Sequence, residues 1–154
     1  MSPDQAILAR KNLDRRLNGV GRDAMSMPPY GWLKAIRQAL GMSATKVAER
    51  MGVTRPRVAA IEKAEVTGGT TLKTLREAAE AMDCVLVYAI VPRTSLDQIV
   101  REQAGKKADA ELARLDHTMR LENQALVTSD LVDERERLVR EILSGSSRRL
   151  WDET

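Results

Sequence analysis

Apolar residues recur at helical spacing through most of residues 4–82. A recurrence every three or four positions is typical of helices that bury one face. Ser43, Thr54 and Thr71 are suitable N-terminal caps, and Gly41 and Gly52 are suitable helix ends. The helices predicted from this pattern span residues 4–17, 32–40, 44–51, 54–63 and 71–82. The first half of the chain is therefore expected to be mainly α-helical.

The segment CVLVYAIVP, residues 84–92, has a different pattern: it is almost continuously apolar, rich in β-branched residues and ended by Pro92. These features favour a β-strand. A lone strand cannot satisfy its backbone groups, and no second convincing strand is found in the sequence. We therefore expect antiparallel pairing with the same strand of a second copy about a two-fold axis. The residues of this expected dimer strand are Val85, Leu86, Val87, Tyr88, Ala89 and Ile90.

Helical patterns return after the expected strand. Residues 94–126 read as one long helix or two abutting helices, with Gly105 marking a kink, and residues 128–143 as a further helix. The tail that follows contains Trp151. Three regions are thus predicted: a basic N-terminal helix and linker (1–29), a helical domain with the strand (30–92), and a C-terminal helical region for dimerisation or partner binding (93–154).

The stretch ATKVAERMGVTRPRVAAIEK, residues 44–63, fits a helix-turn-helix. This motif packs two helices steeply across a tight turn. It needs apolar inward positions, a small residue at the closest approach of the helices, and a turn residue that tolerates positive φ. Every such position holds an allowed residue type. The expected core consists of Val47, Ala48, Met51, Gly52, Val53, Val58 and Ile61.

Pro56 lies in the first turn of the second helix of this motif, where backbone N–H groups have no intrahelical partner to lose. Arg55 and Arg57 then project from the end that enters the major groove in such motifs. Arg55 is expected to read a base, Arg57 a base or a phosphate, and Ala60 a thymine methyl group. Two exposed arginines can also merely keep a helix soluble, but the filled pattern around them favours DNA contact. The candidate phosphate contacts are Ser43, Lys46, Thr54 and Lys63.

Charge is unevenly distributed, although the net charge is only +3. Residues 1–93 contain 15 Lys and Arg against 9 Asp and Glu, whereas residues 94–154 contain 10 against 13. A basic front half suits a polyanion, and its N-terminal segment suits a phosphate backbone or a minor groove. The acidic rear half suits a different task.

Residues 32–92 resemble the lambda-repressor-like, Xre-type DNA-binding domain of five helices. The resemblance implies operator binding in the major groove by a dimer. One departure is Ala44, where the family often has a glutamine that contacts phosphate. Over almost the whole chain, the stretches PPYGWLKAIRQALGMS, EKAEVTGGTTLKTLREAAEAMDCVLVYAIVP, LENQAL and RRLWDE are similar to the bacterial family called mobile mystery protein A. That likeness implies a regulator encoded beside a Fic-domain protein and acting as its antitoxin-like partner.

Other signals are weak. Cys84 is the only cysteine and His117 the only histidine, so neither a disulfide within the chain nor a metal site is expected. TGGTT, residues 67–71, lacks the ending of a phosphate-binding P-loop. No apolar run approaches the roughly 20 residues of a membrane span, and no secretion signal is seen. We expect a cytoplasmic protein that is not an enzyme and needs no cofactor.

The sequence therefore predicts a homodimeric, sequence-specific transcriptional regulator, most simply an autorepressor of its own operon. Its helix 54–63 would read an inverted-repeat operator in double-stranded DNA. The alternative is an antitoxin-like protein that binds and neutralises a Fic-type partner, with DNA binding secondary. The motives for this alternative are the acidic C-terminal half and Trp151.

Overall fold

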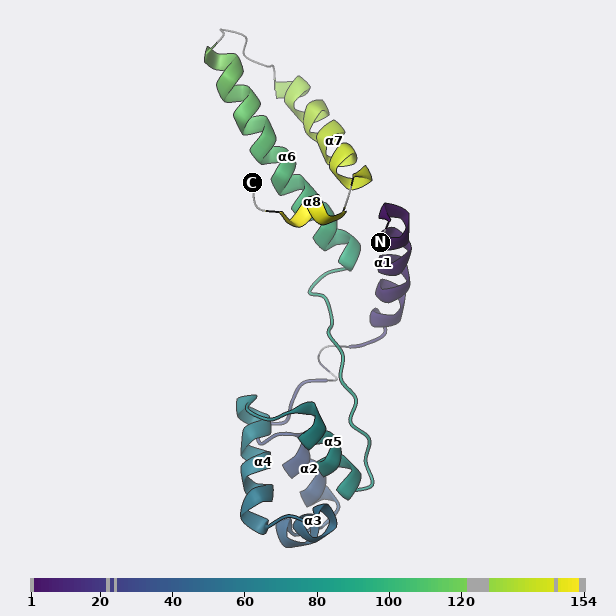
Figure 1. Ribbon diagram of the computed structural model, residues 1–154, viewed down its shortest axis with the longest axis vertical. Helices are drawn as coiled ribbons and strands as arrows, with labels where there is room; N and C mark the ends of the chain where they lie inside the picture. Colours follow the sequence, from purple (N-terminus) through teal and green to yellow (C-terminus); the bar gives the residue numbers. More distant parts are fainter. Residues whose placement is uncertain (1, 22, 24, 122–127, 146, 153–154) are drawn as a thin grey trace. The chain divides into compact units, whose positions relative to one another are not determined.

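Most of the residues that the structure describes lie in helices, which confirms the mainly α-helical fold predicted from the sequence. The computed structural model describes residues 2–21, 23, 25–121, 128–145 and 147–152 (Figure 1). The chain folds as two units: the central unit, Gly21–Ile90, and the terminal unit, which combines Met1–Val20 with Val91–Thr154. The central unit is thus inserted, along the chain, between two parts of the terminal unit.

The central unit contains four short helices: α2 (Trp32–Ala39), α3 (Ala44–Met51), α4 (Arg55–Thr67) and α5 (Leu72–Ala81). Three of them begin at a hydroxyl cap, as the sequence predicted. Ser43 Oγ accepts from the Lys46 N–H at 3.1 Å, and Thr71 Oγ1 accepts from the Thr74 N–H at 3.1 Å. Thr54 caps α4 in the same way. Each cap contributes about 1 kcal/mol, so the helix starts are determined locally.

Helix α2 has a cap from another helix. Its N-cap residue is Gly31, with φ +84°, which has no side chain to offer. The carboxylate of Glu65, on α4, accepts from the N–H groups of Trp32 and Leu33, both at 3.0 Å. Glu65 is buried, and these bonds satisfy its charge inside the unit. One carboxylate thereby ties the first turn of α2 to α4.

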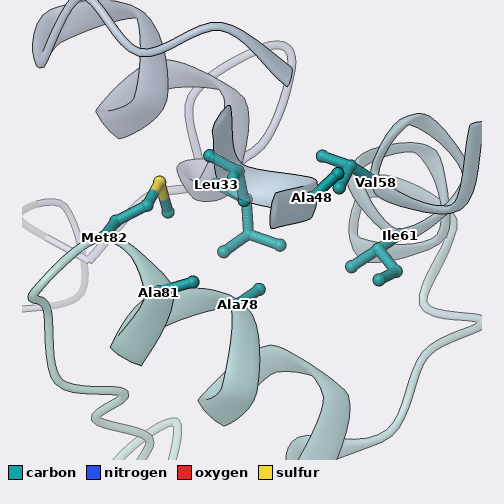
Figure 2. Close-up of a cluster of buried hydrophobic side chains, with 8 residues drawn as sticks. Leu33, Ala48, Val58, Ile61, Ala78, Ala81 and Met82 are labelled. Carbon is teal, nitrogen blue, oxygen red and sulfur yellow. The ribbon is translucent and has the colours of Figure 1, made fainter. Parts of the chain in front are cut away.

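Side chains from all four helices form the core of the central unit (Figure 2). This core is aliphatic, as expected for a chain without phenylalanine. Half-buried Met51, Leu75 and Cys84 pack against it. Its buried members are Leu33, Val47, Ala48, Val58, Ile61, Ala78, Ala81 and Met82. The two helices that precede and follow the tight turn are therefore held by a shared interior.

The terminal unit consists of α1 (Pro3–Leu17), α6 (Leu96–Leu121), α7 (Thr128–Ser144) and α8 (Ser147–Trp151). Helices α6 and α7 lie antiparallel, and α8 lies against α6 (Figure 1). Ala104 and Ala108 on α6 are fully buried, as is most of Leu138 on α7. Small residues on α6 therefore bring these helices close together.

Helix α6 continues through Gly105, so residues 96–121 form one helix and not two abutting ones. Gly105 is buried, and a β-carbon there would lie 2.9 Å from Arg135 Nη2. Glycine at this position makes room for a neighbouring side chain and does not interrupt the helix.

Helix α1 belongs with the C-terminal helices, whereas the sequence grouped residues 1–29 as a segment of their own. The carboxylate of Asp14 accepts from the N–H groups of Leu96 at 2.7 Å and Asp97 at 3.2 Å, at the start of α6. Arg10 lies 4.0 Å from Asp97. The start of α6 is thus stabilised by α1 across more than 80 residues of chain.

The β-strand expected at residues 84–91 is not found among the described residues, where this segment has neither helix nor strand. Val85, Val87 and Ile90 are 85%, 70% and 88% exposed. β-Branched composition gives strand propensity, but a strand exists only where a second one pairs with its backbone. No such partner segment lies within the described part of this chain.

Candidate nucleic-acid interface

A left-handed glycine makes the turn between α3 and α4. Gly52 has φ +68° and ψ +32°, a backbone conformation that residues with a β-carbon rarely adopt. Its N–H donates to the carbonyl of Glu49 at 3.2 Å, and the Val53 N–H donates to that of Ala48 at 3.0 Å. These bonds end α3 and direct the chain into α4 within three residues. The start of α4 is thereby fixed relative to α3.

The inward face of α4 anchors it in the central unit. Val58 and Ile61 are each only 3% exposed and pack with Val47 and Ala48 of α3 (Figure 2). Val53, expected in the motif's core, lies at the edge of the turn with 36% of its surface exposed. The orientation of α4 is therefore set mainly by Val58 and Ile61.

The opposite face of α4 is exposed from end to end. Arg55, Arg57, Ala60 and Lys63 are all exposed, as is Ala59. At about 100° per residue, the two alanines and Lys63 lie opposite the buried positions, and the arginines flank them. Ala59 was not among the contacts predicted from the sequence. Only its helical position, on the same outward face as Ala60 and Lys63, could have identified it. Because alanine side chains are small, the base edges in a DNA groove could approach this face of the helix closely.

The carboxylates of α4 are both turned toward α2. Glu62 binds Arg37 through two hydrogen bonds, at 2.5 Å from Nε and 3.1 Å from Nη2. This pair is largely buried, and the Glu62 carboxylate raises the pKa of the Arg37 guanidinium through their hydrogen bond. Glu65 caps α2, as described above. Neither negative charge is therefore left on the outward face.

The cations of α4, in contrast, are unpaired within the part of the chain that the structure describes. Within the described part of the chain, the side chains of Arg55, Arg57 and Lys63 make no ion pair or hydrogen bond. Cations nearby are engaged: Arg50 donates to Asp83 at 3.0 Å and to the Ala81 carbonyl at 2.9 Å. The outward face of α4 thus has three cations available to an anionic partner.

Comparison with protein families identifies this part of the chain. Residues 33–88 match the family model described as Helix-turn-helix. The segment is a helix-turn-helix domain. Domains of this family bind DNA in regulatory proteins. Neither the curated proteins nor the solved structures gave a match to the chain.

In the helix-turn-helix domain, two of the three capping hydroxyls lie close to the exposed cations in sequence. Ser43 and Thr54 use an oxygen lone pair to accept a backbone N–H, so each hydroxyl hydrogen remains able to donate. Lys46, another candidate phosphate contact, is paired with Glu49 at 3.1 Å. Both side chains of this pair are about 60% exposed, so the interaction is weak and exchangeable. Lys46 can therefore change partner at little cost.

Other site types find no support in the part of the chain that the structure covers. It holds no group of three or more His, Cys, Asp or Glu able to bind a metal ion. None of its helices is both long enough and apolar enough to span a bilayer.

Proposed function

We propose that this protein is a sequence-specific, DNA-binding transcriptional regulator that places α4 in the major groove. The observation that supports this most strongly is the division of charge on α4. Its three cations are exposed and unpaired among the described residues, whereas its two carboxylates are engaged with α2. If the charged side chains served only to keep α4 soluble, exposed positive and negative residues would be expected side by side on it.

In the proposed complex, Arg55 reads a base edge from the first turn of α4. A bidentate contact to guanine O6 and N7 discriminates by about 1–3 kcal/mol. Arg57 contacts a base or a phosphate, and Ala60 contacts a thymine methyl group. Ser43, Lys46, Thr54 and Lys63 hold phosphates, which position the helix without reading sequence.

The test is a binding titration against DNA upstream of the protein's own gene, with scrambled DNA of equal length as reference. We expect upstream DNA to bind about a thousandfold more tightly. Arg55→Ala should remove most of that margin. Arg114→Ala, which deletes the same charge from α6 of the terminal unit, is the control and should change neither affinity.

Equal affinity for the two DNAs, changing only with salt, would contradict sequence reading by α4. It would mean that the arginines hold phosphate alone. Equal loss on Arg55→Ala and Arg114→Ala would point to net charge and not to the helix-turn-helix domain.

We further propose that two copies pair through residues 84–90. Val85, Val87 and Ile90 expose apolar surface on an extended segment, while half-buried Cys84 anchors its beginning to the core. Antiparallel pairing would satisfy its backbone and place Val85 and Val87 beside their counterparts on one face of a two-stranded ribbon. Two α4 helices about 34–36 Å apart would then match the half-sites of an inverted repeat. Autorepression of the protein's own operon is the simplest use of such a dimer.

Sedimentation equilibrium tests the proposed pairing. Val87→Pro removes a backbone donor and is expected to give a monomer with an intact helix-turn-helix domain. Val87→Thr keeps the donor and the β-branched shape, so it should remain a dimer. A dimer that survives Val87→Pro unchanged would place the interface elsewhere.

A second candidate function, an antitoxin-like interaction with a Fic-domain protein, is favoured by the structure of α8. Leu150 is 5% exposed, whereas its neighbour Trp151 is 55% exposed. The Leu150 carbonyl accepts from Gln103 Nε2 at 3.2 Å, and the Arg149 carbonyl accepts from Lys107. A firmly held helix thus presents a tryptophan to solvent, and tryptophan is common at the centres of interfaces.

Trp151→Ala tests this second function better than removal of residues 146–154, because the deletion would also remove buried Leu150. The test uses a Fic-domain protein encoded beside this gene, and its proposed complex with the chain is expected to weaken at least tenfold, with upstream-DNA affinity unchanged. Asp152→Ala is the neighbouring control. If Trp151→Ala leaves the complex intact, α8 is not the contact.

A further inference from the structure

The terminal unit has a cavity of about 660 Å³, widely open to solvent, between α1, the beginning of α6 and the end of α7. Helix α1 contributes Arg10, Lys11 and Arg15, and α6 contributes Arg101. Apolar Ile7 and Leu143 complete part of the wall. The lining therefore combines concentrated positive charge with some apolar surface.

Two carboxylates also line this cavity, but both are engaged. Asp14 accepts the N–H groups at the start of α6, as described above. Asp97 accepts from Arg101 Nε at 2.7 Å and lies 4.0 Å from Arg10. Asp97 is thus the partner of Arg101 and the nearest carboxylate to Arg10. Lys11 and Arg15 are left with no ion pair among the described residues.

Arg10 supplies an independent observation. Its Nε atom is buried and has no hydrogen-bond partner among the described residues, since Asp97 is too distant to accept from it. A buried charged donor without an acceptor is costly, so such groups are normally satisfied. An anion bound beside Arg10 would balance this buried positive charge, although Nε itself is not accessible from the cavity and would have to move to donate to it.

We propose that this cavity binds a small molecule carrying a multiply charged phosphate or carboxylate group. Lys11 and Arg15 would bind the anion by charge-assisted hydrogen bonds, with Arg10 beside them, and Ile7 and Leu143 would contact the rest of the molecule. The cavity is lined by three helices of the terminal unit, which suits a compact ligand better than a continuous DNA backbone. This inference does not rest on the proposed function, because binding can be measured without DNA.

The experiment is calorimetric titration of the full chain with pyrophosphate and with citrate, at constant ionic strength set by chloride. The two probes distinguish a phosphate from a carboxylate source. At least one should bind with a defined stoichiometry of one per chain. Lys11→Ala and Arg15→Ala are expected to weaken it about tenfold each.

Arg16→Ala is the matched control, because Arg16 follows Arg15 on α1, is exposed and does not line the cavity. It should change affinity less than twofold. Equal weakening by Arg15→Ala and Arg16→Ala would overturn the proposal in favour of non-specific attraction. The proposal would also be overturned if neither pyrophosphate nor citrate binds. If Lys11→Ala and Arg15→Ala then weaken DNA binding alike, α1 contacts a DNA backbone instead.

Discussion

A β-carbon placed on Gly31 would lie 2.5 Å from Glu65 Oε2, so these two residues fit together only because one of them is glycine. The φ of +84° at Gly31 adds a second requirement. Together they allow the Glu65 carboxylate to reach the N–H groups that begin α2. The entry of the chain into the helix-turn-helix domain thus depends on a contact between residues 34 positions apart.

Gly31→Ala is expected to destabilise the central unit by more than about 1 kcal/mol, through positive φ and through displacement of Glu65. Urea unfolding followed by circular dichroism measures this loss. Gly41→Ala is the control, because Gly41 also has positive φ, +65°, but no atom within 4 Å of the added β-carbon. If both variants lose equal stability, the contact with Glu65 contributes nothing.

Arg55→Ala and Lys63→Ala should affect DNA binding in different ways: the first should reduce sequence discrimination and the second overall affinity. Loss of a base contact reduces the ratio between upstream and scrambled DNA, with a discrimination loss of about 1–3 kcal/mol. Loss of a phosphate contact weakens both DNAs alike and reduces the slope of log K against log salt by about 1. Filter binding at several salt concentrations separates the two. Identical behaviour of the variants would contradict the roles proposed for them.

Asp14→Ala should destabilise the terminal unit by about 1–2 kcal/mol, because two N–H groups at the start of α6 lose a charged acceptor. Ser95→Ala removes the local cap, in which Ser95 Oγ accepts from the Gln98 N–H at 3.0 Å. We expect a smaller loss from Ser95→Ala, since that oxygen is neutral and serves one donor. Thermal unfolding of both variants gives the comparison, and a larger loss from Ser95→Ala would contradict the importance of α1 as a cap.

Acid should weaken the packing of α6 against α7. Arg135 donates to Asp109 at 2.6 and 3.2 Å across these helices and lowers the pKa of that carboxyl through the hydrogen bonds. A lowered pKa means that the stabilisation is complete above the ordinary pKa of aspartate and disappears as pH falls through the folded-state value.

The effect should be modest, because both side chains of this pair are about half exposed. Stability measured between about pH 5 and about pH 2.5 should fall less steeply in Asp109→Asn than in the parent. Asp116→Asn breaks a pair with Arg120 inside α6 and serves as control. An unchanged pH profile in Asp109→Asn would show that the pair does not join the helices.

Local chemistry made much of the helix-turn-helix domain predictable. The caps at Ser43, Thr54 and Thr71 act on residues three positions away, and Gly52 acts on the helix it ends. Such information lies within a few residues of sequence. The exposed arginines of α4 follow from the same short window.

What sequence reasoning missed depends on residues that are distant along the chain. Glu65 and Asp14 look like ordinary surface carboxylates until the fold brings them to the starts of α2 and α6. Pairing of Arg37 with Glu62 is equally invisible, although it decides which charges α4 leaves free. Pairing of residues 84–90 with a second copy likewise does not follow from composition alone, because a strand depends on a neighbour.

The bonds from Asp14 to the start of α6 connect two stretches of chain that lie on either side of the whole helix-turn-helix domain. A protease that cut once in each connector would release that domain as a single piece. It would leave α1 and the C-terminal helices as separate polypeptides, still held together by the Asp14 carboxylate and the packing around it. The terminal unit is therefore built from two segments of chain whose only covalent connection is the helix-turn-helix domain between them.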